Sequence, residues 1–395
     1  MKQTYIGKQC FTGTEILSPF YMQVEDGVIQ AIGAGNPPEE ILTSTDPIDL
    51  KGELVTPGWI DAHCHIVKGK DDLGNGVDFE SPARLAETLI RSGKNAEAML
   101  KAGVVAIRDL GSTHGYALGV RDAIEAGLIM GPKIVASGQA LCATGGHGFT
   151  ISIEADGPLA MKKAARQVIK NGADCVKIMV SGGVNSPGPE PAPAELTLDE
   201  IQAATDAAHA LGRKVAVHTH GNTAIRRCVE AGVDSIEHGV FLTEDLMEIM
   251  AEKGIALVPT LSAPYYAVNE GLKAEPNNPD HAKSKEVLQR HRKAVITAHK
   301  KGVMVAFGTD AGTPFNTYEN VAYELVLMVR KAGFKPIEAL TCATVNSAKL
   351  LGIDDHLGQL APGMEASFLV FAGNPLQSIE SVVEEKEIYY KGVRI

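Results

Sequence analysis

The sequence predicts an α/β fold, a (β/α)8 barrel of the TIM type with a small β-sandwich domain built from both chain ends. Three observations support this prediction. In the middle of the chain, about 57–357, eight short apolar or β-branched runs alternate with helical patterns. Several of these helical patterns end at a glycine, as helices often do, shortly before the next run begins. The two chain ends instead contain short alternating segments separated by turn residues.

The eight predicted strands cover 59–63, 104–108, 133–137, 175–180, 214–218, 234–237, 255–259 and 303–307. The predicted helices cover 81–102, 159–171, 198–211, 223–231, 244–253, 283–301 and 318–331. Alternation of this kind implies parallel strands joined by right-handed crossovers, and eight strands match a barrel of usual size. An open doubly wound sheet is the alternative, but no Gly-x-Gly-x-x-Gly sequence follows the first strand, which disfavours it.

The chain ends are predicted to form strands at 21–24 and 27–32 and again at 366–371 and 388–393. Because both ends have this character and the middle does not, we expect them to pair with each other. The expected domains are therefore a composite β-sandwich of residues 1–56 plus 358–395, and a barrel of residues 57–357.

Composition limits the partners of the protein. The 395 residues include 37 Lys and Arg against 48 Asp and Glu, a net charge of −11. This charge argues against sequence-independent binding of nucleic acid and against an anionic membrane surface. The first residues lack the apolar stretch of a signal peptide, no run is long enough to span a bilayer, and the six cysteines show no paired spacing. We therefore expect a soluble, cytoplasmic protein with reduced thiols.

The ends of the predicted strands carry metal-binding residue types. In a barrel of this kind the chemistry lies at the carboxyl ends of the strands. His63 and His65 end the first strand, and residues two apart on a strand face the same side. Further possible ligands end the fifth, sixth and eighth strands, namely His218 with His220, His238, and Asp310. Each alone could be a buried or loop residue, but four strand ends together indicate a divalent metal site.

Lys177 lies within the apolar run of the fourth strand. A lysine is rarely buried without a partner, because desolvating its charge costs several kcal/mol. Two interpretations stay open at this point. Lys177 either pairs with an acid such as Asp310, or its neutral amine is carboxylated by CO2 and bridges two metal ions.

These residues carry a resemblance to a known family. The run 58–65, Gly-Trp-Ile-Asp-Ala-His-Cys-His, resembles the first-strand signature of the amidohydrolase superfamily. The runs 176–184, 217–221 and 236–239 resemble motifs of its binuclear, carboxylated-lysine branch, which includes prolidase-like Xaa-Pro dipeptidases and ochratoxinase-like amidases. The resemblance covers nearly the whole chain, including the ends, which in the family form a small composite sandwich.

The resemblance implies two divalent metal ions and a set of ligands for them. The implied ligands are His63, His65 and Asp310 for one ion, His218 and His238 for the other, and carboxylated Lys177 bridging both. Nitrogen and oxygen ligands of this kind suit zinc without excluding manganese or cobalt. His220 is expected above the metals, in contact with the substrate, rather than as a ligand.

The resemblance further implies metal-dependent hydrolysis of the amide bond of a dipeptide or N-acyl amino acid. Asp310 would accept a proton and pass it to the leaving amine. His147, in the glycine-rich loop 143–148, resembles a histidine that reaches the substrate carbonyl in the prolidase-like branch. His147 and His220 are the candidates for stabilising the oxyanion, and the alternative for His147 is a surface histidine.

Two other functions are weighed against this one. The first is a cyclic-amide hydrolase or deaminase of the same superfamily, disfavoured because the run that begins at His218 reads His-Thr-His-Gly, with no Glu. The second is a non-catalytic metal-binding scaffold. Such enzymes commonly form oligomers, so we expect a homo-oligomer acting on a small-molecule substrate.

Four long strand-end loops, 66–83, 138–158, 181–197 and 260–282, are expected to shape the pocket. The Pro- and Gly-rich part of the third loop is either a lid or a passive insertion. His114 is expected to be structural, and five other histidines are expected to be solvated, namely His209, His281, His291, His299 and His356. No arginine for a substrate carboxylate is identified, since Arg84 begins a helix.

Overall fold

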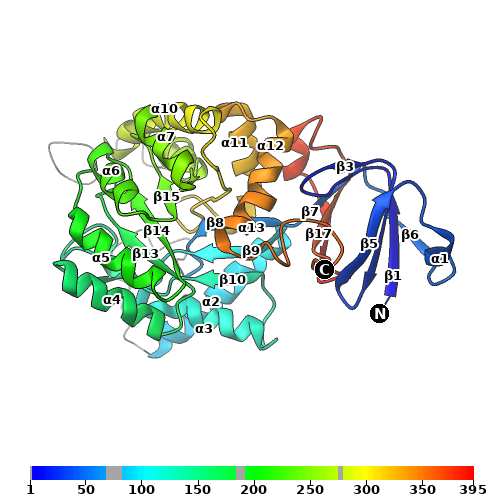
Figure 1. Cartoon of the computed structure of the whole chain (residues 1–395), viewed down its shortest axis with the longest axis horizontal. Helices are drawn as coiled ribbons and strands as arrows, with labels where there is room; N and C mark the ends of the chain where they lie inside the picture. Colours follow the sequence, from blue (N-terminus) through cyan, green and yellow to red (C-terminus); the bar gives the residue numbers. More distant parts are fainter. Residues whose placement is uncertain (1, 68–81, 184–191, 275–278) are drawn as a thin grey trace.

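The computed structural model describes residues 2–67, 82–183, 192–274 and 279–395. Figure 1 shows a larger unit of strands surrounded by helices, with a smaller β-rich unit beside it that contains both chain ends. Within the described residues, no helix is long and apolar enough to cross a membrane.

Parallel strands form the centre of the larger unit, and the predicted strands one to seven are present. They are β8 (Trp59–Cys64), β9 (Val104–Asp109), β10 (Lys133–Ala136), β13 (Cys175–Met179), β14 (Lys214–Thr219), β15 (Ser235–His238) and β16 (Ala256–Val258). Two short strands, β11 (Ala140–Cys142) and β12 (Ser152–Glu154), fall in a segment predicted to be a loop. The sheets have the orders β10-β9-β8 and β12-β11-β13-β14-β15-β16.

The eighth predicted strand, 303–307, is not a regular strand, although it is hydrogen-bonded like one. Val305 forms a parallel bridge with Leu257 of β16, and the Ala62 amide of β8 donates to the Phe307 carbonyl at 2.8 Å. The Phe307 amide donates at 3.1 Å to the Ser347 hydroxyl. The segment therefore lies between β16 and β8. Because the Phe307 amide donates to a side chain, the hydrogen bonds between neighbouring strands are not continuous along the segment.

At the other side Asp174 joins the two parallel sheets, since its amide donates to the Ala136 carbonyl at 2.8 Å and its carboxylate accepts from the Ala136 amide at 3.0 Å. The strands and the segment around Val305 therefore follow one another in the order that a TIM-type barrel requires. All their carboxyl ends lie on the same side, which is where the candidate site is found.

Helices cover the outside of these strands (Figure 1). They are α2 (Pro82–Lys101), α3 (Tyr116–Glu125), α4 (Pro158–Lys170), α5 (Leu198–His209), α6 (Asn222–Glu230), α7 (Glu244–Lys253), α8 (Ser262–Asn269), α9 (Gly271–Ala274), α10 (Pro279–Lys300), α11 (Tyr323–Ala332), α12 (Pro336–Thr341) and α13 (Ser347–Leu351). The seven predicted helices are present with small shifts at their ends. The prediction of a loop at 260–282 is wrong, because α8, α9 and the start of α10 lie there. Pro264 does not prevent α8 from forming, since proline is tolerated in the first turn of a helix.

The smaller unit contains two sheets. The first has the order β5-β4-β1-β6 and the second the order β19-β18-β17-β7-β2-β3. Their strands are β1 (Lys2–Gly7), β4 (Phe20–Glu25), β5 (Val28–Ala34) and β6 (Pro47–Asp49), then β2 (Cys10–Phe11), β3 (Ile16–Leu17), β7 (Leu54–Pro57), β17 (Phe368–Phe371), β18 (Lys386–Tyr390) and β19 (Val393–Arg394). A short helix, α1 (Glu39–Leu42), precedes β6. Antiparallel pairing of β7 with β17 brings both chain ends into one sheet.

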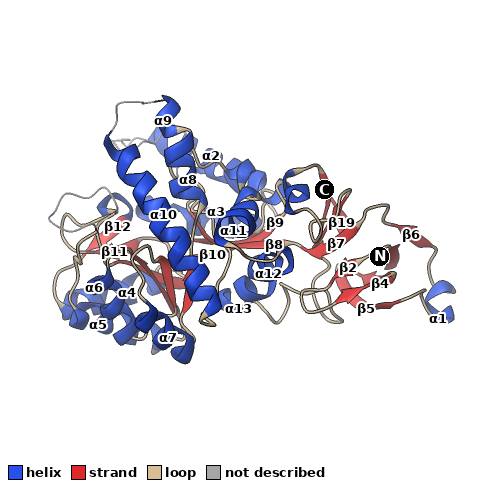
Figure 2. Ribbon diagram, turned by 90° about the horizontal axis from the view of Figure 1, so that it is seen from above, coloured by secondary structure: helices blue, strands red, loops and turns tan. Residues whose placement is uncertain are grey.

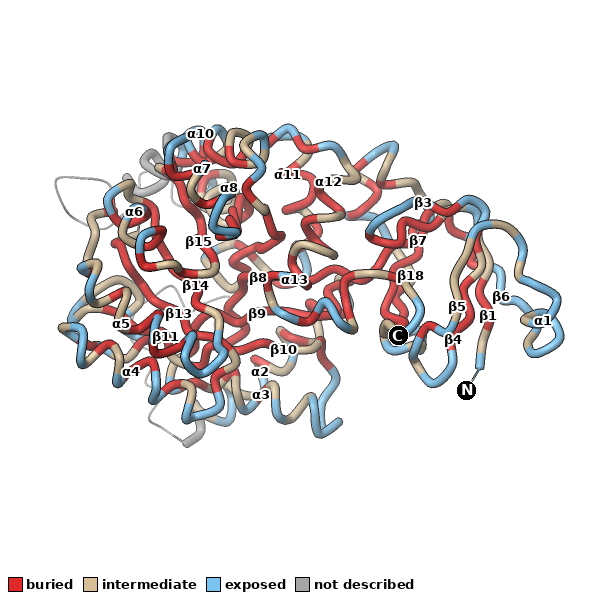
Figure 3. The backbone as a smooth tube through the Cα atoms, in the orientation of Figure 1, coloured by how far each residue is buried: buried red, intermediate tan, exposed pale blue. Residues whose placement is uncertain are grey.

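Buried side chains connect the two units. The fully buried Trp59 of β8 packs against Phe371 of β17, with ring centroids 5.9 Å apart. Within the smaller unit, Tyr5 and Phe368 bring the two sheets together edge to face at 5.4 Å. Figure 3 shows that buried residues follow the strands of the larger unit.

Candidate metal centre

A pocket of about 540 Å³ opens at the carboxyl ends of the strands. Every site residue predicted from the sequence lines it, namely His63, His65, His147, Lys177, His218, His220, His238 and Asp310. The structure therefore brings together side chains from β8, β13, β14 and β15 and their ends, from the position after the segment 303–307, and from one loop.

His63 and His65 project from β8 with fixed ring orientations. The His63 Nδ1 atom is 2.7 Å from Glu237 Oε2, and the His65 Nδ1 atom is 3.0 Å from the Gly111 carbonyl oxygen. The two Nε2 atoms lie 3.5 and 3.3 Å from Asp310 Oδ1. Because Nδ1 of each ring has a hydrogen-bond acceptor, Nε2 is the nitrogen left to bind a metal. The Asp310 carboxylate, which faces both Nε2 atoms, is the third possible ligand.

Asp61, a buried acid to which the sequence analysis gave no role, holds this part of the site together. Its carboxylate accepts hydrogen bonds from the His63 amide at 3.0 Å and from the Thr309 amide at 3.1 Å. The Thr309 hydroxyl donates to the same carboxylate at 2.5 Å. Burial raises the pKa of Asp61 to about 7, although these hydrogen bonds act in the opposite direction. Asp61 therefore fixes the backbone on both sides of the pair formed by His63 and Asp310.

Three residues at the site have left-handed backbones that non-glycine residues rarely adopt. They are His238 with φ 67°, Thr260 with φ 52° and Asp310 with φ 57°. The Thr260 hydroxyl lies 2.7 Å from His238 Nδ1, so it orients that ring as Glu237 orients His63. Such conformations cost of order 1–3 kcal/mol each and cluster at functional sites.

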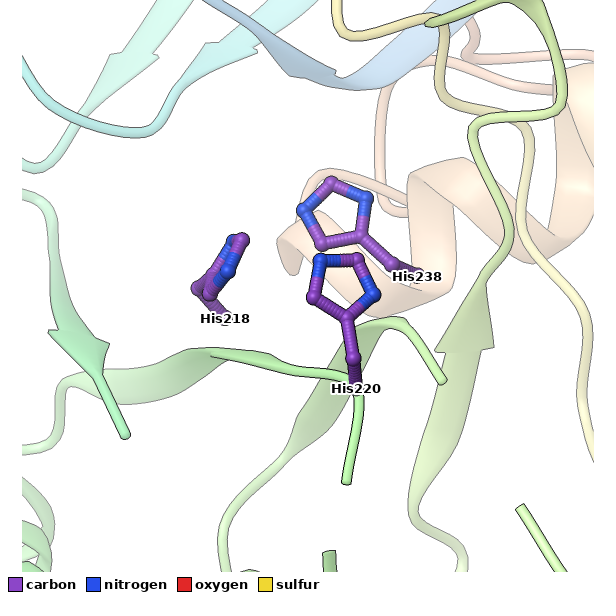
Figure 4. A group of neighbouring side chains, drawn as sticks. All are labelled: His218, His220 and His238. Atoms are coloured by element: carbon purple, nitrogen blue, oxygen red, sulfur yellow. The ribbon is translucent and has the colours of Figure 1, made fainter. Parts of the chain in front are cut away.

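His218, His220 and His238 gather with their rings toward one another (Figure 4). Their ring centroids are 4.7 to 4.9 Å apart. One possible ligand atom from each lies within 4.8 Å of the others, and the same holds for His63, His238 and Asp310. His220 thus lies among the possible ligands, closer to them than the resemblance implied. Within the described residues, His218 Nε2 and His220 Nδ1 have no hydrogen-bond partner.

Burial favours the uncharged form of four histidines of the site, His63, His218, His220 and His238. Burial lowers the pKa of His63 to about 4 and that of His220 to about 3. Burial and the neighbouring histidines keep the pKa values of His218 and His238 well below the ordinary value. Neutral imidazoles are the form that binds metal ions.

Lys177 of β13 reaches the same pocket and is 1% exposed. Burial lowers the pKa of its amine to about 8, although Glu237 and Asp310 act to raise it. Among the described side chains, its Nζ atom has no hydrogen-bond partner. Lys177 therefore makes no hydrogen bond to Asp310, although the charges of both Asp310 and Glu237 act on its amine.

Arg108 and Glu237 form a buried ion pair behind His63 that the sequence analysis missed. Arg108 Nη2 donates to Glu237 Oε1 at 2.9 Å, and its Nε donates to the Ala62 carbonyl at 2.7 Å. The Ser235 hydroxyl also donates to Glu237 Oε1 at 2.5 Å. Burial alone would raise the pKa of Glu237, but Arg108 and the hydrogen bond from His63 lower it to about 2. The available signal was the presence of Arg108 and Glu237, two charged residues, within the predicted strands 104–108 and 234–237.

His147 is positioned by its loop and lies over His218, with ring centroids 4.3 Å apart. The His147 amide donates to Glu195 Oε2 at 2.8 Å. A Cβ atom added to Gly183 would lie 3.0 Å from His147 Cε1, so a larger residue there would push the ring by a few tenths of an ångström. His147 is half-buried and lines the pocket.

His291 corrects a second prediction. It was expected to be solvated, yet it is 1% exposed and lines the pocket from α10. The available signal was its place on the apolar face of that helix, four residues from the buried Val287 and Val295. His114 is exposed and does not line the pocket, and the side chain of His281 lies outside the described residues.

The predicted loops contribute unequally to the pocket. Parts of 66–83 and 181–197, including most of the possible lid, lie outside the described residues, as does the side chain of Arg84. The described wall is instead made by the loop that carries His147, by α8 and α10, and by residues 313–314.

Residues 54–391 match the Amidohydrolase family, and the chain belongs to that family. It is accordingly a hydrolase, and its histidine and aspartate cluster is able to hold metal.

Ochratoxinase of Aspergillus niger is 32% identical over 395 residues, which cover 92% of this chain and 80% of that protein. The crystal structure of a Xaa-Pro dipeptidase with bound methionine in the active site has a TM-score of 0.88 and 30% identity, covering 100% of both chains. A prolidase complexed with N-methylphosphonate-L-proline has a TM-score of 0.87 and 29% identity, with 100% of this chain and 99% of that chain covered. These similarities confirm the resemblance to the prolidase-like and ochratoxinase-like branch.

Proposed function

We propose that the protein is a metal-dependent hydrolase that cleaves the amide bond of a dipeptide or N-acyl amino acid. The proposed ligands of two divalent ions, with zinc expected, are His63, His65, His218, His238, Asp310 and a carboxylated Lys177. The observation that carries the proposal is the common orientation of the rings, since Nδ1 of His63, His65 and His238 has a partner while Nε2 is left for a metal.

The residues fit metal ions on physical grounds. Lys177 Nζ and His218 Nε2 are buried without hydrogen-bond partners in the described structure, which costs free energy unless a ligand satisfies them. Carboxylation would form a bond between Lys177 Nζ and the carbon of CO2 with loss of a proton from the amine. The lysine would then be an anionic oxygen ligand between imidazoles and a carboxylate, a set suited to zinc.

The ions, when bound, would supply a water of lowered pKa and polarise the amide carbonyl. Asp310, which faces the Nε2 atoms of His63 and His65, accepts the proton of the attacking water and returns it to the departing amine nitrogen. His147 and His220 line the same pocket and donate toward the carbonyl oxygen as it gains negative charge.

The architecture that supports this site is proposed with it. We infer that the seven parallel strands and the segment 303–307 close into an eight-stranded barrel over residues 57–357. Residues 1–56 and 358–395 would form a composite β-sandwich, consistent with the pairing of β7 and β17. A cytoplasmic homo-oligomer remains the expectation, which light scattering and cell fractionation test.

One set of measurements tests the proposal. The metal-loaded protein is screened against dipeptides, N-acyl amino acids and cyclic amides, and its metal content is determined. We expect two metal ions per chain and hydrolysis of dipeptides or N-acyl amino acids. We also expect a ¹³C signal from a carbamate formed with labelled CO2, which the Lys177→Met variant should lack. The Asp310→Asn variant should lose about 10²- to 10⁴-fold in kcat, because its proton acceptor is gone.

Other outcomes would contradict the proposal in different ways. Hydrolysis of cyclic amides with one ion and an unmodified Lys177 favours the cyclic-amide hydrolase or deaminase. Full metal occupancy without hydrolysis of any substrate favours the non-catalytic scaffold. An unchanged kcat in Asp310→Asn excludes the assigned proton transfer.

A further inference from the structure

One wall of the pocket is contributed by two helices rather than by strand ends. On α8, the residues Ala263, Pro264 and Ala267 line the pocket, and on α10 the residues Val287 and His291 do so. Figure 2 shows α8 and α10 side by side over the strands. We call this set of five residues the α8–α10 wall.

The α8–α10 wall is held in place by contacts behind it. The buried carboxylate of Glu324 accepts hydrogen bonds from the Leu261 amide at 2.9 Å and the Ser262 amide at 2.6 Å, which fixes the start of α8. Arg290 of α10 lies over the ring of Phe241, 5.5 Å from its centroid. The wall is thus preformed, and a ligand need not order it.

The described wall is apolar except for one side chain. Ala263 and Ala267 are one helical turn apart and project only methyl groups, which leaves room in front of α8. Val287 adds an apolar surface from α10. No charged side chain belongs to the wall, so a charged substrate group placed there would lose its hydration without gaining a partner.

His291 is the polar exception. Its ring is 1% exposed, and the backbone of His238 and of Pro259 approaches it, but within the described residues neither ring nitrogen has a partner in hydrogen-bond geometry. A buried imidazole left without partners costs free energy, and such groups in native structures call for an explanation. Because His291 lines the pocket, a polar atom of a bound ligand is the available partner.

We propose that the α8–α10 wall is the subsite for one apolar group next to the scissile amide, and that His291 hydrogen-bonds a polar atom of the same substrate. This inference rests on the proposed function and narrows it. The preferred substrates carry a large uncharged side chain or acyl group, and those with Asp, Glu, Lys or Arg at that position are disfavoured.

The size of the subsite is tested by filling it. Two substrate series are used, N-acetyl amino acids with side chains from glycine to leucine and phenylalanine, and N-acyl glycines with acyl chains of increasing length. We expect wild-type kcat/KM to rise with apolar size in one series. In Ala267→Phe it should fall at least tenfold for the largest members and less than about threefold for the smallest, since one lost apolar contact of this size is worth 10- to 200-fold. The matched control is Ala210→Phe, at an exposed position after α5.

The role of His291 is tested by His291→Phe, which keeps a ring but removes both nitrogens, and by His291→Gln, which keeps a donor. We expect KM to rise about tenfold in His291→Phe, with kcat and metal content near wild type, and His291→Gln to recover part of the loss. A purely structural role would lower kcat and the melting temperature for all substrates alike, and that result would overturn the assignment.

Binding measurements separate this inference from the proposed function. If the wild type hydrolyses neither series, the proposed function fails, and calorimetry with N-acetyl-L-leucine and N-acetylglycine still tests the subsite. We expect the preference for the leucine compound to disappear in Ala267→Phe. Folded Ala267→Phe and Ala263→Leu variants that keep the wild-type preference, or a wild type without any preference, would overturn the subsite.

Discussion

The substitution Glu237→Gln tests how the buried ion pair controls the metal centre. Glu237 accepts hydrogen bonds from Arg108, from Ser235 and from His63 Nδ1. If the amide oxygen of glutamine stays toward Arg108, its NH2 group faces His63 Nδ1, which must then act as an acceptor. The ring proton would move to Nε2, the nitrogen that faces Asp310. The opposite orientation places an NH2 group against the Arg108 guanidinium. Two donors then face each other without an acceptor, which destabilises the folded protein more.

Two magnitudes follow from this geometry. Disturbing the partner that orients a metal-binding histidine typically lowers metal affinity by about 10- to 100-fold, or roughly 1.4 to 2.7 kcal/mol. Breaking a buried ion pair costs about 3–5 kcal/mol, and since glutamine still accepts from Arg108 we expect about 2 to 4 kcal/mol in the free energy of unfolding. The depressed pKa of Glu237 adds a pH dependence. Its stabilising contribution is full above the ordinary pKa of 4.5 and is lost as pH falls toward about 2, so the variant has a flatter acid profile.

The assays are urea denaturation of the metal-free protein between pH 2 and 7 and a zinc competition titration with a chromophoric chelator. Ser235→Ala is the matched control, because it removes one donor to the same carboxylate without changing the partner of His63. It should lower stability by about 1 kcal/mol and leave zinc affinity within about threefold. Equal zinc affinity in Glu237→Gln and the wild type would refute the assignment of Glu237 as the group that fixes the His63 ring.

Three further predictions concern the positioning of His147, the α8–α10 wall and the junction of the two units. Gly183→Ala places a methyl group against the ring of His147 and should lower kcat about 10- to 100-fold with little change in stability, whereas Gly119→Ala, with open space around its Cβ within α3, should leave kcat unchanged and raise stability by about 0.5–1 kcal/mol. Glu324→Ala leaves two buried amides of α8 without acceptors and should cost roughly 2 to 4 kcal/mol in urea denaturation, and a loss below 1 kcal/mol would count against this role. Lys386 of β18 lies at the junction, with its Nζ atom 5.0 Å from the centroid of the Trp59 ring. Burial lowers the pKa of this lysine to about 8, so the unfolded chain binds more protons above that pH and stability should rise between about pH 8 and 10.5. Lys386→Met should remove this rise and add roughly 1 to 3 kcal/mol at pH 7, and identical pH profiles for the two proteins would refute it.

Sequence reasoning located the candidate site because its residues end strands. A histidine or aspartate at the end of an apolar run must lie at the carboxyl edge of the parallel sheet, whatever the loops do. The position of His63, His218, His238 and Asp310 at strand ends was enough to predict that they lie together, and all four line one pocket.

The same reasoning failed where the partner comes from elsewhere in the chain. His291 enters the pocket from a helix, and its burial depends on how α10 packs, which periodicity alone indicates but does not settle. The ion pair of Arg108 and Glu237 joins strands that are not neighbours in sequence. The segment 303–307 has the composition of a strand, yet side chains such as Ser347 take backbone groups that a continuous ladder would need.

The pairing of β7 with β17 has a consequence for synthesis of the chain. β7 ends at Pro57, but the strand that covers its edge begins at Phe368. At ribosomal rates of about 5–20 residues per second, roughly 15 to 60 seconds separate the emergence of the two strands. During that interval β7 presents unpaired backbone groups, and exposed strand edges are where chains associate wrongly. The smaller unit is completed last, so chains that stall late in translation would carry all the candidate metal ligands and still have an open sheet.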